Sequence, residues 1–256
     1  MSETAATIAN IGAFLNSTLR VKGIRDASVN GLQVRSRKRG EIRKVGFAVD
    51  ACLSTFEQAA HEKTDLLVVH HGIKWRPQKD RELELRRAAF LKRRNIALYA
   101  AHLPLDLHHE YGNNMQLCRM LDVHRLKRFG RYHGIKIGYA GTFNRARSLS
   151  KVAERLSDGL GAPCRILPFG RDRIRSIGIV SGGGGDMLKD AHELRLDCFV
   201  IGEADLAVYI AAREYDMNLL VAGHYATETV GVRALMPLIK ETFGVQTVFI
   251  DDPKDL

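Results

Sequence analysis

The sequence predicts an α/β protein made of two similar halves, each with a largely parallel β-sheet. Three observations support this prediction. Short, wholly apolar segments alternate with amphipathic segments, as expected for buried parallel strands joined by helices. The alternation occurs twice along the chain with the same order of elements. The chain has 256 residues, which is enough for one large domain or two modest ones.

The first half is predicted to begin with a helix and to continue with strands and helices in turn. Ile8, Ile11, Phe14 and Leu15 recur at helical spacing, so the first twenty residues are expected to form an amphipathic helix. The elements expected after it are a strand at 45–49, a helix at 53–62, a strand at 66–69, a helix at 82–94 and a strand at 96–101.

The second half repeats the first. The segment "VGFAVDACLSTFEQAAHEKTDLLVVH" from Val45 resembles "IGIVSGGGGDMLKDAHELRLDCFVIG" from Ile177 in its order of strand, turn, helix and strand. The third strands, from Asn95 and Asn218, each end in a histidine that an acid follows four positions later. Self-similarity over this length indicates a duplicated unit. The boundary is expected near 128–134, which gives halves of 1–130 and 131–256.

Composition limits the class of protein. The chain is 45% hydrophobic and 27% charged, with 39 basic against 29 acidic residues and a net charge of +10. A basic balance favours anionic partners such as nucleotides or nucleic acid. No apolar run reaches the roughly 18 to 20 residues of a membrane span, so a soluble, cytoplasmic protein without a membrane partner is expected.

The cysteines are consistent with a reducing compartment. They lie far apart without CxxC spacing, at Cys52, Cys118, Cys164 and Cys198. Such spacing indicates neither a zinc knuckle nor a disulfide framework.

Side chains that bind metals follow three of the predicted strands. They are His70 and His71, His102 with Asp106, and His224 with Glu228. In parallel sheets ligands gather at the carboxyl ends of the strands. A histidine at one strand end is more often a structural residue than a ligand, but three strand ends of this kind favour a shared site. Imidazole and carboxylate together suit zinc, manganese, iron or nickel.

The last two pairs have the same spacing but are predicted to lie in different local structures. His224 precedes an apolar helix expected at 230–243, and Glu228 lies one turn later, so both residues share one face. The alternative is that His224 or Thr227 only caps the helix and that Glu228 favours the positive end of its dipole. Pro104 disfavours a regular helix between His102 and Asp106, so a loop is expected there.

Five or six ligands are too many for one tetrahedral structural ion. They suit two divalent ions roughly 3.5–4 Å apart. Such a pair lowers the pKa of a water molecule towards neutrality and stabilises developing negative charge, which indicates hydrolytic chemistry.

Other motifs allow two interpretations. "SGGGGD", Ser181 to Asp186, follows a strand, so its amides suit either a phosphate or a tight turn with close backbone packing. Asn30-Gly31 indicates a turn, with Gln33 as a polar contact to substrate. Several basic runs are expected to be solvated faces, although they also suit nucleic acid. They are Arg35 with Arg37, Lys38 and Arg39; Lys92 to Arg94; and Arg125 with Lys127, Arg128 and Arg131.

One basic group lies directly beyond the histidine pair. Lys74 and Arg76 flank Trp75. These cations suit an anionic substrate, and the indole suits stacking on a base.

Four motifs in order carry a resemblance to a known family. They are Asn30-Gly31-Leu32-Gln33-Val34, Val69-His70-His71-Gly72, Ala101-His102 through Leu105-Asp106, and Gly223-His224 through Thr227-Glu228. Together, over about residues 30 to 230, they resemble the GTP cyclohydrolase 1 type 2 homologue family, also called the Nif-three-like family. The resemblance implies a Nif-three-like fold of two similar halves, a centre of two divalent metal ions and a toroidal homohexamer.

The resemblance also implies roles for individual residues. By motif, His70 would bind one ion with His224, His71 would bind the other with Asp106, and Glu228 would bridge the two. His102 falls beside the centre, with a supporting or catalytic role. The chain departs from many relatives in two places. Leu103 follows His102 where they have threonine, and Ala204 and Asp205 follow Gly202-Glu203 where they have a histidine shortly after the Gly-Glu pair. The metal ligands are unaffected by these differences.

The function expected is a metal-dependent hydrolase acting on a nucleotide, with GTP cyclohydrolase-type ring opening as the family's named activity. His102 and Glu228 are the expected catalytic residues, and Gln33, Lys74, Trp75 and Arg76 the expected substrate contacts. The alternatives are a metal-dependent phosphoesterase, a non-catalytic metal-containing ring that binds nucleic acid or a regulatory protein, and a regulator that senses metal.

Overall fold

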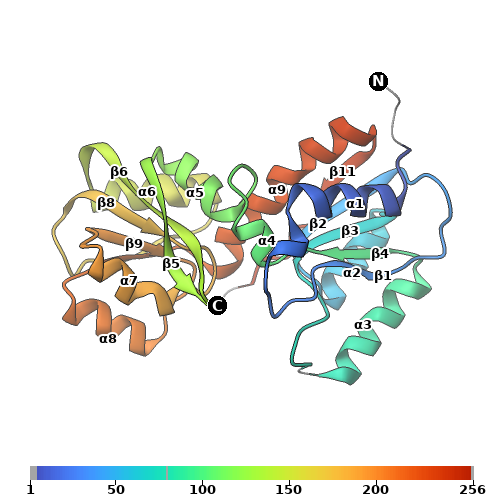
Figure 1. Cartoon of the computed structure of the whole chain (residues 1–256), viewed down its shortest axis with the longest axis horizontal. Coiled ribbons are helices and arrows are strands. Elements are labelled where there is room, and N and C mark those ends of the chain that lie inside the picture. Colours follow the sequence, from blue (N-terminus) through green and yellow to red (C-terminus); the bar gives the residue numbers. More distant parts are fainter. Residues whose placement is uncertain (1–4, 79, 255–256) are drawn as a thin grey trace. The chain divides into compact units, whose positions relative to one another are not determined.

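The computed structural model describes residues 5–78 and 80–254, which form two compact α/β units (Figure 1). The first unit comprises the described residues up to His108 together with Val232–Asp252. The second comprises His109–Gly231 together with residues 253 and 254. The predicted α/β class with two similar halves is confirmed.

The first unit contains a five-stranded sheet in the order β1-β4-β3-β2-β11. Strands β2, β3, β4 and β11 are parallel, and β1 is antiparallel to β4. Its elements are α1 (Ile8–Thr18), η1 (Val21–Gly23), β1 (Gly31–Val34), β2 (Lys44–Asp50), α2 (Leu53–His61), β3 (Leu66–His71), α3 (Arg81–Arg93), β4 (Ala97–Ala100), α4 (Leu103–Asp106) and β11 (Gln246–Phe249).

Helices cover both faces of this sheet. Phe56 of α2 and Leu91 of α3 are fully buried in one core cluster with strand residues such as Val69. On the opposite face, Tyr99 of β4 donates a hydrogen bond from its hydroxyl to Asn16 Oδ1 of α1 at 3.0 Å. Burial on both faces explains why the strands are almost continuously apolar in sequence.

The second unit contains a six-stranded sheet in the order β5-β6-β8-β9-β10-β7. Helices α5 and α6 lie over one face, and α7 and α8 over the other (Figure 1). Its elements are α5 (Asn113–Leu121), β5 (His124–Tyr132), β6 (Ile135–Ser148), α6 (Leu149–Leu160), β7 (Arg165–Leu167), β8 (Arg173–Ile179), η2 (Gly185–Met187), α7 (Leu188–Glu193), β9 (Cys198–Ile201), α8 (Leu206–Glu214) and β10 (Asn218–Val221). Helix α9 (His224–Phe243) follows, and the chain passes along it back into the first unit.

The two units share one topology. The order β1-β4-β3-β2 of the first sheet corresponds to β7-β10-β9-β8 of the second, including the antiparallel edge strand. Equivalent aspartates make equivalent contacts. Asp65 Oδ2 accepts hydrogen bonds from the backbone N–H groups of Arg43 and Lys44 at 2.8 and 3.3 Å. Asp197 Oδ2 accepts from those of Arg175 and Ser176, both at 2.9 Å.

The division of the chain differs from the expected 1–130 and 131–256. The first unit ends at His108, and residues 232–252 return to it, because β11 pairs in parallel with β2. The hairpin of β5 and β6 extends the second sheet instead. Among the described residues, no helix is both long enough and apolar enough to cross a membrane.

Two local expectations are corrected. His102 and Asp106 are joined by the short helix α4 and not by a loop, because Pro104 lies in its first turn, where no helical N–H is required. The last helix begins at His224, not at 230, so His224 and Glu228 both lie within its first turns.

Candidate metal-binding site

The first two candidate ligands lie at the carboxyl end of β3, where the sheet holds both rings in place. His70 is fully buried, and its Nδ1 lies 3.0 Å from the carbonyl oxygen of Ala101. His71 Nδ1 lies 2.9 Å from Asp50 Oδ1, at the end of the neighbouring strand β2. Carbonyl and carboxylate oxygens only accept, so each Nδ1 carries the proton and each Nε2 presents a lone pair.

A third imidazole, His102, is held in the same way. Its Nδ1 lies 2.9 Å from Asp26 Oδ1, and its backbone N–H donates to Asn30 Oδ1 at 2.7 Å. Burial works to raise the pKa of Asp26, but the contact with His102 and the hydrogen bonds from Asn30 and Ser28 outweigh it and lower the pKa to about 2. Asp26 is therefore a carboxylate at neutral pH.

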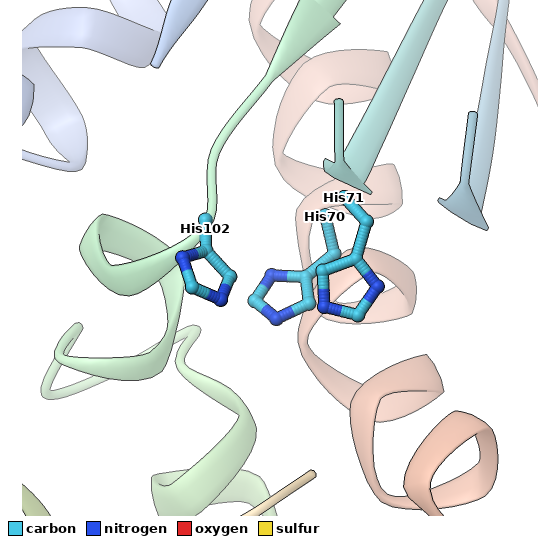
Figure 2. A group of neighbouring side chains, drawn as sticks. All are labelled: His70, His71 and His102. Atoms are coloured by element: carbon cyan, nitrogen blue, oxygen red, sulfur yellow. The ribbon is translucent and has the colours of Figure 1, made fainter. Parts of the chain in front are cut away.

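The three imidazoles form one group (Figure 2). Their ring centroids are 4.6 Å apart for His70 and His71, 5.1 Å for His70 and His102, and 5.5 Å for His71 and His102. One nitrogen from each ring lies within 4.8 Å of the others. Oriented imidazoles with their lone pairs gathered together are the donor set that transition metals bind, so His70 and His71 fit a divalent ion, and His102 lies beside them.

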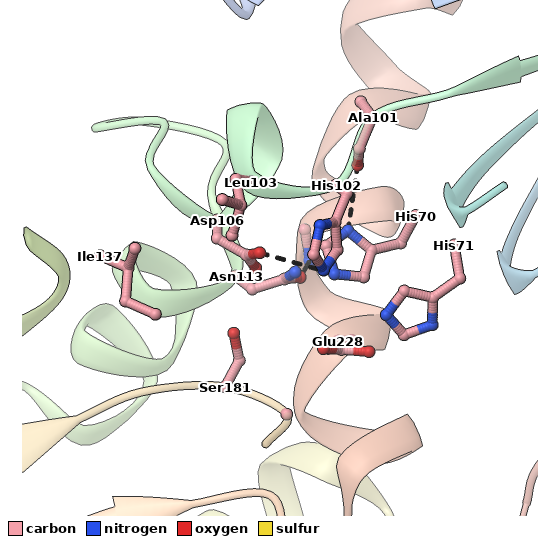
Figure 3. A network of polar contacts seen from close by, with 12 residues as sticks. His70, His71, Ala101, His102, Leu103, Asp106, Asn113, Ile137, Ser181 and Glu228 are labelled. Carbon is pink, nitrogen blue, oxygen red and sulfur yellow. Dashed lines mark hydrogen bonds and ion pairs between the residues drawn. The ribbon is translucent and has the colours of Figure 1, made fainter. Parts of the chain in front are cut away.

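A carboxylate completes the group in the first unit (Figure 3). Asp106 Oδ2 lies 3.6 Å from His70 Nε2, and the Asp106 side chain is 9% exposed. The structure thus brings Asp106 beside His70, whereas the family resemblance pairs Asp106 with His71. The short helix α4 makes this approach, because it turns the chain back towards β3 directly after His102.

The second unit holds the other predicted pair. His224 Nε2 lies 3.2 Å from Glu228 Oε1, one helical turn away, and His224 Nδ1 lies 3.0 Å from Glu203 Oε2. Burial lowers the pKa of His224, but the hydrogen bonds and charges of Glu228 and Glu203 raise it to about 9. The pair therefore favours a positive charge between the imidazole and Glu228, where a divalent cation would also be stabilised.

The glycine-rich loop packs against this pair. Gly182 adopts a φ of +63°, and a Cβ there would overlap Glu228 Oε1 and lie 3.0 Å from His224 Nε2. Its backbone N–H donates to Thr227 Oγ1 at 3.0 Å. The contacts of Gly182 thus correspond to the close-packing interpretation of "SGGGGD".

Of the predicted substrate contacts, Trp75 lies beside the histidine group of the first unit. The Trp75 ring is 5.1 Å from the His102 ring and 6.1 Å from the His71 ring. Lys74 is half-buried and Arg76 is exposed. Gln33 is buried; its Oε1 accepts hydrogen bonds from two backbone N–H groups of the loop after β3, and its Nε2 donates to the carbonyl of Val29.

Sequence reasoning missed three acids of the site. Asp50 is the last residue of β2 and Glu203 follows β9, so the rule that ligands gather at carboxyl strand ends could have found them. Asp26 lies in an irregular segment before β1, and no periodicity or spacing in the sequence marks it.

Comparison with known proteins shows the family of this chain. Residues 6–255 match the family described as Duf34/NIF3 (NGG1p interacting factor 3). A protein of Pyrococcus abyssi named "GTP cyclohydrolase 1 type 2 homolog" is 42% identical over 248 residues, 96% of this chain and 98% of that protein. A protein of Archaeoglobus fulgidus with the same name is 39% identical over 250 residues, 97% of this chain and 99% of that protein.

A solved structure is also similar. The crystal structure of TTHA1606 from Thermus thermophilus has a TM-score of 0.86 and 36% identity, covering 97% of this chain and 99% of that one. The family match, the curated relatives and this structure all extend over nearly the whole chain. The chain belongs to the DUF34/NIF3 family.

Proposed function

We propose that this protein is a divalent-metal-dependent hydrolase that acts on a nucleotide. The observation that carries the proposal is the group of His70, His71 and His102. Each of the three imidazoles has its Nδ1 engaged by an oxygen acceptor, and one nitrogen from each ring lies within 4.8 Å of the others. Such second contacts are typical of histidines that bind metals.

Two ions are proposed, and the candidate ligands are considered unit by unit. His70, His71 and Asp106 would contribute from the first unit, and His224 and Glu228 from the second. Imidazoles and carboxylates together suit zinc, manganese, iron or nickel. When bound, such ions supply an activated water molecule and stabilise the negative charge that develops during hydrolysis.

The chain's own residues would bind substrate and move protons. His102 is proposed to accept and return a proton through Nε2, because its Nδ1 is engaged by Asp26. Lys74 and Arg76 would bind the phosphates, and Trp75 would stack on the base. Glu228 would orient the attacking water.

The names of the relatives favour ring opening of a purine nucleotide as the reaction. Phosphoester hydrolysis would use the same residues, since paired metal ions also stabilise displacement at phosphorus. A ring of six chains is proposed from the family resemblance alone, and a cytoplasmic location from the spacing of the cysteines. Mass measurement in solution by light scattering would test the ring.

Glu228→Gln tests the proposal, because it preserves size while removing the negative charge. Protein purified without added metal should contain about two divalent ions per chain, and Glu228→Gln should contain fewer. Chromatography of a nucleotide panel should show product for the wild type and at least about 10²-fold slower turnover for the variant. The exposed Glu214→Gln on α8 is the matched control. Wild-type protein without bound ions, or full turnover by Glu228→Gln, would contradict the proposal.

A second function, binding of nucleic acid, is favoured by a separate groove in the second unit. This groove has a volume of about 990 Å³ and lies between β5, β6 and α7. The cations lining it are Arg125, Lys127, Arg128, Arg131 and Lys136, against two acids, Asp190 and Glu193. Phosphate backbones are bound by such excess positive charge.

Charge reversal tests this second function. Lys127→Glu/Arg131→Glu should weaken binding of single-stranded nucleic acid at least about tenfold and reduce the salt dependence. Lys92→Glu/Arg93→Glu changes the net charge equally on α3, whose residues do not line the groove, and is the matched control. Equal losses in both double variants would show that overall charge, and not the groove, is responsible.

A further inference from the structure

The buried carboxylate of Asp26 lies against Nδ1 of His102. We propose that Asp26 is a positioning residue, which fixes the His102 tautomer so that Nε2 is the nitrogen that accepts a proton during the reaction. This inference rests on the proposed hydrolase function and adds a residue to it.

The hydrogen bonds around Asp26 require a carboxylate. Within the described part of the chain, its two oxygens meet only donors. Oδ1 accepts from the Ser28 N–H at 3.0 Å and faces His102 Nδ1 at 2.9 Å. Oδ2 accepts from Asn30 Nδ2 at 2.8 Å and from the Leu103 N–H at 2.9 Å. The Asp26 side chain is 2% exposed, so water offers it little compensation for a lost partner.

Because Asp26 has no hydrogen to donate, His102 Nδ1 must be the donor. The ring is fixed further by its own backbone, since the His102 N–H donates to Asn30 Oδ1 at 2.7 Å. Trp75 packs its ring against the imidazole at 5.1 Å, with an interplanar angle of 70°. The tautomer and the orientation of His102 are therefore both set before any substrate binds.

A simpler role for Asp26 is to cap α4, because Leu103 is the first residue of that helix. The two roles make different predictions for Asp26→Asn. If the new amide nitrogen points towards Asn30, it faces two other donors, Asn30 Nδ2 and the Leu103 N–H, and both hydrogen bonds are lost. If the amide nitrogen points towards His102, only the hydrogen bond from the Ser28 N–H is lost, and the amide donates to His102 Nδ1. The second orientation loses fewer hydrogen bonds, so His102 should change tautomer and carry its proton on Nε2.

Exchanging the two side chains should reverse this change. In Asp26→Asn/Asn30→Asp, the aspartate at 30 accepts from the amide of residue 26 and still accepts the His102 N–H. The carboxamide oxygen at 26 then faces His102 Nδ1 again. The exchange restores the proton on His102 Nδ1, but the Leu103 N–H still faces an amide nitrogen and stays without its acceptor at residue 26. The exchanged variant therefore distinguishes an effect of the tautomer from an effect of the helix cap.

The experiment measures ¹⁵N chemical shifts of labelled histidines, kinetics and metal content in the three proteins. Asp26→Asn should move the His102 proton to Nε2 and lower kcat by about 10²-fold or more, with KM and metal content near those of the wild type. The exchanged double variant should recover the tautomer and most of kcat. The spectra do not depend on turnover, so a wild type that hydrolyses no nucleotide would defeat the proposed function, while the tautomer would still decide the role of Asp26.

Two results would overturn the inference. One is an unchanged His102 tautomer in Asp26→Asn. The other is a loss of kcat that the exchanged variant does not recover, which would identify Asp26 as a helix cap alone. If Asp26→Asn does not fold, the wild-type spectrum and that of the exchanged variant still decide, since a proton on Nε2 in the wild type contradicts the inference.

Discussion

At the scale of single residues, Gly182 shows how backbone packing supports chemistry. Its positive φ is strained for a residue that has a Cβ atom. A Cβ at this position would also displace the side chain of Glu228 or His224. The requirement comes from contacts distant in sequence, which explains why the run of glycines alone allowed both a phosphate site and a tight turn.

Gly182→Ala should therefore disturb both stability and metal binding. Gly161 has almost the same φ, +64°, with nothing within 4 Å of an added Cβ, so Gly161→Ala measures the backbone strain alone, about 1–2 kcal/mol. Gly182→Ala should cost at least about 1 kcal/mol more, because atoms must shift, and it should lower metal content. Denaturant unfolding and elemental analysis provide the test; equal costs at both positions would refute it.

At the scale of elements, the equivalent aspartates Asp65 and Asp197 each bind the backbone of a neighbouring strand in their unit. Burial raises the pKa of Asp197, but hydrogen bonds from Ser176 and Arg175 and the nearby Arg171 lower it below its ordinary value of 3.8. The carboxylate thus stabilises the fold above about pH 4, and the stabilisation is lost as the pH falls through the lowered pKa.

Asp197→Asn should lower the free energy of unfolding by about 1–3 kcal/mol at pH 7, because charged hydrogen bonds are lost. The difference from the wild type should shrink as the pH falls below 4. Asp65→Asn should behave in the same way, since its pKa is also lowered, by Lys38 and backbone N–H groups working against burial. Thermal unfolding across pH 3 to 7 would measure both; a difference independent of pH would contradict this explanation.

The elements that sequence reasoning predicted are those with uninterrupted patterns. The segments at 45–49 and 66–69 are apolar on both faces and correspond to β2 and β3. Their predicted ends lie within two residues of the observed ends. The hairpin of β5 and β6 was not predicted, because β5 is rich in cations and its alternation breaks at the adjacent buried residues Phe129 and Gly130. Strand β11 was not predicted either, since it is short and only partly buried at the edge of a sheet.

The site was predictable to a similar extent and for a similar reason. His70, His71, His102 and Asp106 follow strands or the turn after a strand, and the rule about carboxyl strand ends finds them. Asp26 reaches His102 from a segment 76 residues earlier without regular structure. Tertiary folding alone brings it there, so no local pattern records it.

At the scale of the whole molecule, bound metal should stabilise the fold if the proposed centre is correct. A ligand at about 100 times its dissociation constant adds about 2.7 kcal/mol, which corresponds to roughly 5–10 °C in the unfolding midpoint of a chain of this size. Titration of metal-free protein with Zn²⁺ or Mn²⁺ should raise the midpoint progressively. His71→Ala should remove most of the increase, whereas His61→Ala, at a side chain that is 89% exposed, should retain it. No increase in the wild type would contradict the metal centre.

The place of β11 affects how the molecule is made. Beside β2, this strand completes a sheet whose other members come from the first hundred residues. A ribosome releases the entire second sheet before it releases β11. The first sheet is thus completed only after every strand of the second has been synthesised, and the edge of β2 gains its neighbour at that point.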